Sequence, residues 1–150
     1  MHFEEFVVGQ RFDLGARDIS REEIVDFAAR HDWQPFHLDA EAATQSPFGG
    51  LIASGFQTLL IAFELILEAE LWHGTGMGSP GMDRIRWHAP VRPGERLQVS
   101  AEITAVRRSK TRPDRGTITL TVGVTGRAQV MLMSFDLMAI VACRESEPSA

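Results

Sequence analysis

The sequence predicts an α+β domain in which helices cover one face of an antiparallel sheet. Helical patterns fill the first half of the 150-residue chain, and from Gly81 onward the hydrophobic pattern alternates with a period of two. A short strand followed by helices and then by consecutive strands is typical of this class. Hydrophobic residues make up 44% of the chain and charged residues 23%, values that predict one packed globular domain.

The first predicted strand covers residues 12–18, and a helix follows it. Ser20 has Glu23 three residues later, the spacing of a capping box, so we expect the helix to begin there. Apolar residues then recur at helical intervals. Pro35 and the residue before it disfavour helical geometry, so the helix is expected to end by about His31.

The longest predicted helix runs from Ala53 to about Leu71, after a possible helical turn in "AEAATQSP" and a loop at "SPFGG". It is apolar nearly all round, as expected for a helix enclosed by other elements. Proline and glycine separate the strand candidates that follow it. These four candidates are "MDRIRWHA", "ERLQVSAEITAV", "GTITLTVGV" and "QVMLMSFDLMAIVA".

A curved antiparallel sheet wrapped around a long central helix is the hot-dog architecture. We expect a single domain of this kind over residues 1–150, with a frayed tail at 144–150. In "ERLQVSAEITAV", Leu97 and the apolar residues at every second position after it are expected to face the core.

Composition narrows the classes of function. The net charge of −5 argues against a nucleic-acid partner, and no apolar segment approaches the ~20 residues of a membrane span. The single cysteine, Cys143, cannot form an internal disulfide and suits a reducing compartment. The first residues carry acids where a secretory signal carries a basic start, so we expect a cytoplasmic protein.

One segment departs from the acidic balance. Residues 107–115 carry five cations and one acid. Arg108, Lys110 and Arg112 in this segment are candidates for binding the diphosphate or 3′-phosphate of an anionic ligand, because such groups suit arginine and lysine donors. A solvated hairpin is the alternative interpretation.

The segment "DWQPFH" places Asp32 and His37 at the two ends of a connection stiffened by Pro35. A carboxylate that accepts a proton from water, beside an imidazole that can return one, is a workable acid/base pair near neutral pH. The spacing alone favours the alternative, in which Asp32 caps the next turn and His37 bonds to backbone. With Asp39 the two could also ligate a metal, but no further ligand cluster supports this and we expect none.

The segment "FGGLIASGFQT" brings Ser54 and Gly55 to the start of the long helix. The first amide N–H groups of a helix have no internal partner and can bind an oxyanion, and glycine lets a ligand approach the backbone closely. The alternative is that Ser54 is an ordinary N-cap.

Three stretches of the chain resemble the MaoC-like dehydratase family, which includes the (R)-specific enoyl-CoA hydratases. They are "FAARHDWQPFHLDAEAA", "FGGLIASGFQT" and "RWHAPVRPGERL". The family motif has aspartate, any residue, asparagine, proline, an aliphatic residue and histidine. Asp32, Pro35 and His37 match it, whereas Gln34 replaces the asparagine and His31 replaces a glycine that commonly precedes the aspartate.

The resemblance implies a hot-dog fold, usually dimeric or a higher homo-oligomer, that acts on acyl-CoA with no cofactor besides the coenzyme A of the substrate. Asp32 and His37 then match the pair that holds the catalytic water, and Gly55 matches the glycine whose N–H binds the thioester oxygen. Family members add or remove water across the 2,3 double bond by a syn route. A hot-dog thioesterase and a non-catalytic acyl-CoA-binding or partner subunit are the alternatives, and the acyl group stays open.

Overall fold

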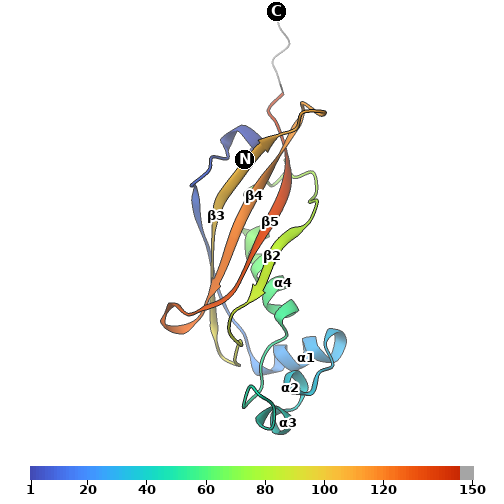
Figure 1. The fold of residues 1–150 in the computed structure, drawn as a ribbon, viewed down its shortest axis with the longest axis vertical. Coiled ribbons are helices and arrows are strands. Elements are labelled where there is room, and N and C mark those ends of the chain that lie inside the picture. The colour runs from blue at the N-terminus through green and yellow to red at the C-terminus, as the bar shows by residue number, and fades with distance from the viewer. Residues whose placement is uncertain (146–150) are drawn as a thin grey trace, which may run out of the picture.

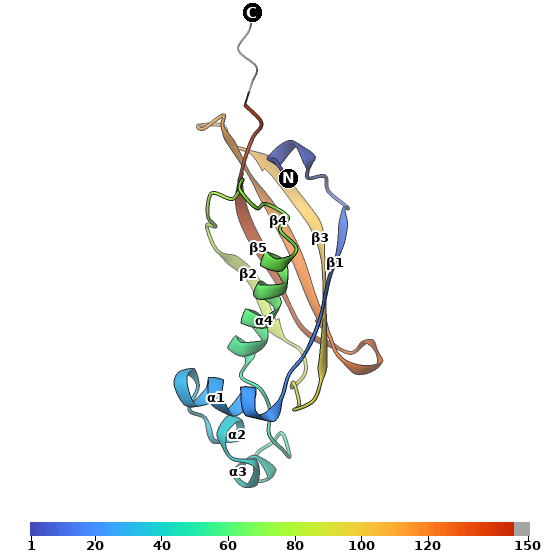
Figure 2. The same cartoon turned by 180° about the vertical axis from the view of Figure 1, so that it is seen from behind.

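An antiparallel sheet curves around one long helix in the computed structural model, which describes residues 1–145 (Figure 1). The strand order is β1-β3-β4-β5-β2, and α4 lies along one face of the sheet (Figure 2). This arrangement confirms the predicted α+β hot-dog domain. The strands are β1 (Arg11–Asp18), β2 (Met82–Trp87), β3 (Arg96–Arg108), β4 (Arg115–Thr125) and β5 (Met131–Ala142). The α-helices are α1 (Arg21–His31), α2 (Pro35–Leu38), α3 (Ala40–Thr44) and α4 (Gly55–Glu68), and short 3-10 turns are η1 (Phe3–Glu5) and η2 (Arg127–Gln129).

The core lies between α4 and the face of the sheet that it covers. Leu97 and Ile103 on β3 are fully buried, as the alternation predicts, and Phe135 on β5 is 1% exposed. From the helix, Ile61 and Ile66 complete the same cluster. Burial of these side chains fixes the register of the strands, since a one-residue slip would turn each of them outward.

The central helix is shorter than predicted. It begins at Gly55 rather than Ala53, because the N–H of Ala53 donates to the carbonyl of Val91 and Ser54 has extended backbone angles. It ends at Glu68, since Glu70 adopts a positive φ of 52°. The helix is also less enclosed than its composition predicts, because part of its apolar surface is open in the single chain.

The three helices α1, α2 and α3 gather at one end of the molecule (Figure 1). Ser20 and Glu23 form the predicted capping box at the start of α1, and Pro35 occupies the first turn of α2. Asp39 caps α3 by accepting hydrogen bonds from the N–H groups of Glu41 and Ala42. These caps fix the short connections that carry the sequence motifs.

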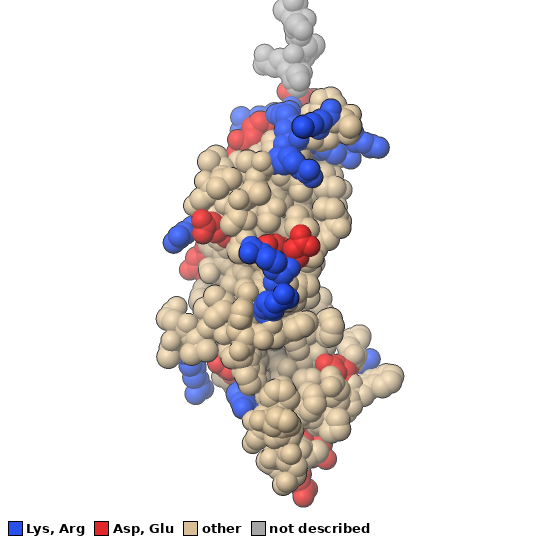
Figure 3. All heavy atoms as spheres, viewed as in Figure 1, with Lys and Arg blue, Asp and Glu red and all other residues tan. Residues whose placement is uncertain are grey.

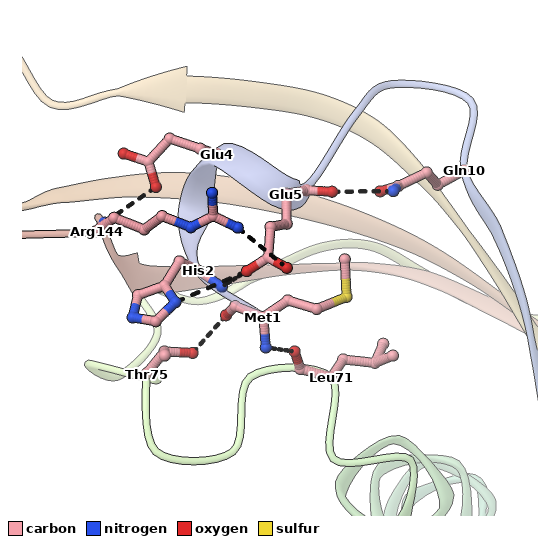
Figure 4. Close-up of polar contacts among 8 residues, drawn as sticks. All are labelled: Met1, His2, Glu4, Glu5, Gln10, Leu71, Thr75 and Arg144. Carbon is pink, nitrogen blue, oxygen red and sulfur yellow. Dashed lines mark hydrogen bonds and ion pairs between the residues drawn. The ribbon is translucent and has the colours of Figure 1, made fainter.

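At the end of the molecule opposite α1–α3, the N-terminal segment forms hydrogen bonds to residues that follow α4 and β5 (Figure 4). The nitrogen of Met1 donates to the carbonyl of Leu71 beyond α4, and Thr75 donates to the carbonyl of Met1. The N–H of Arg144 donates to Glu4, and this bond, together with one from Arg108, lowers the pKa of Glu4 to about 2. Arg144 is therefore held in place where a frayed tail was expected, and the rest of that tail from residue 146 lies outside the described residues.

The turn between β3 and β4 carries the basic segment. Lysine and arginine side chains gather over this end of the molecule (Figure 3), opposite the end that holds α1, α2 and α3 (Figure 1). Among residues 1–145, no helix is both long and apolar enough to cross a bilayer.

Candidate active site

Three segments of chain meet at the carboxylate of Asp32. Asp32 is the C-terminal cap residue of α1, His37 lies on α2, and Ser54 precedes the first residue of α4. The hydroxyl of Ser54 donates to Asp32 Oδ2 over 2.7 Å, and Nε2 of His37 lies 3.2 Å from the same oxygen. Nε2 of Gln34 donates to Oδ1 over 2.8 Å. The structure thus brings together residues that the sequence places up to 22 positions apart.

The orientation of His37 is fixed from its far side. The residue is 4% exposed, and Nδ1 lies 2.8 Å from the carbonyl oxygen of Ile52. A carbonyl oxygen can only accept, so we assign the proton to Nδ1. In neutral His37 the lone pair of Nε2 then faces the Asp32 carboxylate. His37 Nε2 and Asp32 Oδ2 attract each other when Nε2 carries a proton, and a water molecule can join them by donating one hydrogen bond to each.

The hydrogen bonds at Asp32 favour its ionised form. Burial alone raises the pKa of this carboxyl, but donation from Gln34 and Ser54 together with the neighbouring His37 outweighs that effect, so the pKa lies below its usual value. Asp32 is therefore a carboxylate at neutral pH, with Oδ2 directed toward the histidine.

A cavity of about 480 Å³ opens beside this group. Its wall includes Asp32, His37 and Gly55, and it is otherwise mostly apolar. The remaining lining residues are Gln34, Phe36, Phe48, Ile52, Ala53, Phe56, Thr58, Trp87, His88, Ala89, Pro90 and Val91. A largely apolar pocket with a few converging polar groups is the usual form of a small-molecule site.

Gly55 brings the start of α4 to the wall of this cavity. A Cβ atom at position 55 would collide with the indole of Trp87, so only glycine fits under that ring. Ser54 occupies the N-cap position but makes no side-chain cap bond. The positive end of the helix is thus left without a serine cap beside the cavity.

The structure supports only part of the alternative interpretations of the "DWQPFH" segment. Asp32 does not cap the next turn, because α2 has no side-chain cap, whereas His37 does bond to backbone through one ring nitrogen. Asp39 is occupied as the cap of α3. Within residues 1–145 no group of three or more His, Cys, Asp or Glu side chains is placed to hold a metal.

The basic residues lie away from this cavity in the same chain. Arg108 pairs with Glu4 and also donates to the carbonyl of Pro113, so it helps to anchor η1. Lys110 and Arg112 are exposed at the β3–β4 turn. The turn lies at the opposite end of the molecule from α1 and α2 (Figure 1), the helices that carry Asp32 and His37.

Sequence reasoning missed the aromatic part of the wall. Trp87 on β2 and Phe56 on α4 meet with ring centroids 5.7 Å apart, and Phe36 meets Phe48 at 5.1 Å. The alternation of "RIRWH" indicates that Trp87 and Ile85 share a face, but it carries no signal for contact with Gly55.

Comparison with known proteins places the fold and motif in context. The MaoC-like domain model matches residues 5–126. 3-hydroxyacyl-thioester dehydratase Z of Mycobacterium tuberculosis is 31% identical over 126 residues, which cover 83% of each chain. 3-hydroxybutyryl-CoA dehydratase of Methylorubrum extorquens is 28% identical over 155 aligned positions, covering 100% of this chain and 90% of that protein.

A solved structure of a MaoC-like protein also resembles this chain. The crystal structure of a MaoC-like dehydratase from Rhodospirillum rubrum superposes with a TM-score of 0.91 at 33% identity, covering 97% of this chain and 99% of that one.

Replacing Gln34 by leucine tests how Asp32 is kept ionised. The change removes the hydrogen bond to Oδ1, so we expect the pKa of Asp32 to rise, since the ionised form loses a donor. A carbon-13 NMR titration of the Asp32 carboxyl measures this. Gln45→Leu, at an exposed glutamine after α3, is the matched control and should leave that pKa unchanged. Superimposable titration curves for wild type and Gln34→Leu would contradict the assignment.

Proposed function

Since the chain belongs to the MaoC-like domain family, we propose that it is an acyl-CoA hydratase or dehydratase acting on the 2,3 double bond of an enoyl-CoA thioester. The observation that supports this most is that Asp32 and His37, whose Oδ2 and Nε2 atoms are 3.2 Å apart, line one cavity with Gly55, while the buried Ser54 donates to the same Oδ2. The relatives named above act, by their names, on 3-hydroxyacyl thioesters and 3-hydroxybutyryl-CoA.

In the proposed hydration, Asp32 is the base and protonated His37 is the acid. Asp32 removes a proton from water as the water oxygen bonds to C3, and the electrons of the double bond move toward the thioester carbonyl. His37 then delivers its Nε2 proton to C2. Transfer of the proton held by Asp32 across the 3.2 Å contact returns the pair to its starting state. Dehydration is the reverse sequence.

Gly55 supplies the electrophilic assistance in this proposal. Negative charge develops on the thioester oxygen while the enolate forms, and the N–H of Gly55 stabilises it at the positive end of α4. A preorganised donor of this kind lowers a barrier by about 3 kcal/mol in other enzymes. The proposal therefore assigns the water to Asp32 and His37 and the carbonyl to Gly55.

Hydration of crotonyl-CoA and of longer or branched enoyl-CoAs tests the acid/base assignment. We expect Asp32→Asn and His37→Ala each to slow turnover at least ~100-fold, the lower end of general acid/base contributions. Asp26→Asn and His31→Gln change an exposed acid and an exposed histidine near the pair and should leave turnover close to wild type. Turnover by wild type that neither site variant slows would make the assignment wrong.

The same assay separates the other functions. A hot-dog thioesterase releases free coenzyme A, which a thiol-reactive dye detects, whereas hydration releases none. Tight binding of CoA esters without turnover across the whole panel would instead identify a non-catalytic binding or partner subunit.

The open surface of the chain supports a homodimer. Leu60 and Leu67 are 48% and 50% exposed, and with Phe56 and Phe63 they follow the spacing of one helix face. Beside this face, β2 is at the edge of the sheet, where it pairs with β5 within the described chain. We propose that two copies meet along α4 and β2.

A pair of charges on that face tests the dimer. We expect the wild type to have twice the 16.7 kDa mass of one chain in light scattering, and Leu60→Glu with Leu67→Glu to give monomer, because the charges would have to be buried. Val8→Glu, at a residue that is 56% exposed elsewhere, should leave the mass unchanged. A dimer that survives both substitutions on α4 would place the interface on another surface.

In the proposed homodimer, the basic β3–β4 turn of one subunit can reach the active site of the other. An isologous contact that runs antiparallel along α4 sets the α1–α3 end of one chain beside the β3–β4 turn of the other. We propose that Lys110 and Arg112, with a smaller contribution from the engaged Arg108, bind phosphates of the coenzyme A held by the partner subunit.

Neutralising the turn tests this role. Lys110→Gln with Arg112→Gln should raise KM for the CoA ester roughly three- to tenfold, the effect of losing ion pairs worth up to about 1 kcal/mol each. KM for a truncated pantetheine thioester should not change. Arg11→Gln with Arg127→Gln removes the same charge elsewhere and is the control. Equal effects of the turn variant on both substrates would remove the phosphate role.

A further inference from the structure

Thr58 carries a buried hydroxyl without a protein partner. The residue is 1% exposed, and its Oγ1 makes no hydrogen bond to any described residue. Buried hydroxyl groups in folded proteins are almost always hydrogen-bonded, so an exception indicates a group whose partner is supplied from outside the chain.

The position of Thr58 connects this hydroxyl to the candidate active site. Thr58 borders the same cavity as Asp32, His37 and Gly55. It lies three residues after Gly55 and four after Ser54, so all three share one face of α4. Helical side chains lean toward the N-terminus of their helix, which brings the Thr58 side chain toward the first turn.

The other buried atom without a partner has a different setting. It is Oε1 of Gln57, whose Nε2 donates to the carbonyl of Glu23. That side chain borders the polar hollow between α1 and α4, which also contains Arg17 and Arg30, and it is not part of the cavity wall. Thr58 is thus the one of the two that belongs to the site.

Two other polar side chains in the cavity wall have protein partners. Nε2 of Gln34 donates to Asp32, and Nε2 of His88 is bonded to the hydroxyl of Ser134. In the proposed reaction Asp32 and His37 act on water, which leaves the thioester oxygen with the N–H of Gly55. An oxygen that becomes an enolate oxygen can accept more than one hydrogen bond.

We propose that the hydroxyl of Thr58 is a second hydrogen-bond donor to the carbonyl oxygen of the acyl thioester, beside the N–H of Gly55. This inference rests on the proposed function. It predicts that Thr58 recognises the carbonyl group of the ligand and contributes nothing to the stability of the empty fold.

Binding of two unreactive ligands tests the inference. Butyryl-CoA has the thioester carbonyl, whereas the thioether S-butyl-CoA lacks it. By isothermal titration calorimetry, Thr58→Val should weaken butyryl-CoA binding about tenfold, the effect of one buried hydrogen bond, and leave S-butyl-CoA binding unchanged. Thr58→Ser keeps the hydroxyl and should bind both like wild type. Thr119→Val, on β4 away from the cavity, is the control.

Thermal unfolding supplies the second readout. Valine has the shape of threonine without the hydroxyl, so the Tm of Thr58→Val should equal or exceed that of wild type. A clear fall in Tm would show that the hydroxyl has a structural partner and would overturn the inference.

The outcomes separate this inference from the proposed function. If wild type prefers butyryl-CoA over the thioether and Thr58→Val keeps that preference, Thr58 does not contact the carbonyl, while the proposed function stands. If Thr58→Val weakens binding of both ligands equally, the proposed hydrogen bond to the carbonyl is also rejected, because equal weakening indicates a change in the shape of the cavity wall. If wild type binds neither ligand, the site does not take acyl-CoA and both proposals fall.

Discussion

The hydrogen bond from Ser54 to Asp32 is the interaction on which the geometry of the site depends. It joins the end of α1 to the start of α4 across 22 residues of sequence, and it fixes the carboxylate oxygen that His37 faces. The same bond has a second effect. A serine at an N-cap normally accepts a hydrogen bond from the first turn of its own helix, but here the hydroxyl donates to the aspartate and makes no cap bond. The helix start at the cavity wall is therefore left without that cap.

Around this bond, each group at the site holds another in place. The carbonyl of Ile52 orients His37, and Gln34 donates to Oδ1 of Asp32, the oxygen that bonds to neither Ser54 nor His37. Gln34, which stands where the family motif has asparagine, therefore supplies a hydrogen-bond donor to the carboxylate. The indole of Trp87 occupies the space that a Cβ atom at position 55 would need, so the ring packs directly against the glycine at which α4 begins. A site arranged this way would need little rearrangement as charge moves in the proposed reaction, which is the condition for strong electrostatic stabilisation.

Local sequence patterns predicted much of this structure. The capping box at Ser20 and the proline at position 35 indicated the limits of α1, and the alternation around Leu97 indicated the buried face of β3, whereas the short helix α2 that begins at Pro35 was not predicted. These features depend on neighbours within a few residues. The start of α4 was predicted two residues early because it is decided by Val91, whose carbonyl pairs with Ala53.

Other features of the site depend on contacts between distant segments. The partner of Ser54, the contact of Trp87 with Gly55 and the unpaired hydroxyl of Thr58 have no local signal in the sequence. The basic turn was predicted to bind phosphate, but only the fold reveals that it lies at the far end from Asp32 in its own chain, so the phosphate role now requires a second copy.

The proposed role of the Asp32–His37 pair is tested most directly by the stereochemistry of hydration, that is, by whether the hydroxyl and the C2 proton add to the same face of the double bond. Asp32 Oδ2 and His37 Nε2 are 3.2 Å apart, so in the proposed reaction one pair places the water oxygen on C3 and the proton on C2 from the same side of the substrate. Hydration of crotonyl-CoA in deuterium oxide, followed by proton NMR of the 3-hydroxybutyryl product, distinguishes the two faces. The adjacency of the pair predicts one diastereomer, with deuterium at C2 added syn to the new hydroxyl. Anti addition, or a mixture of diastereomers formed before any exchange, would contradict a reaction carried out by this pair.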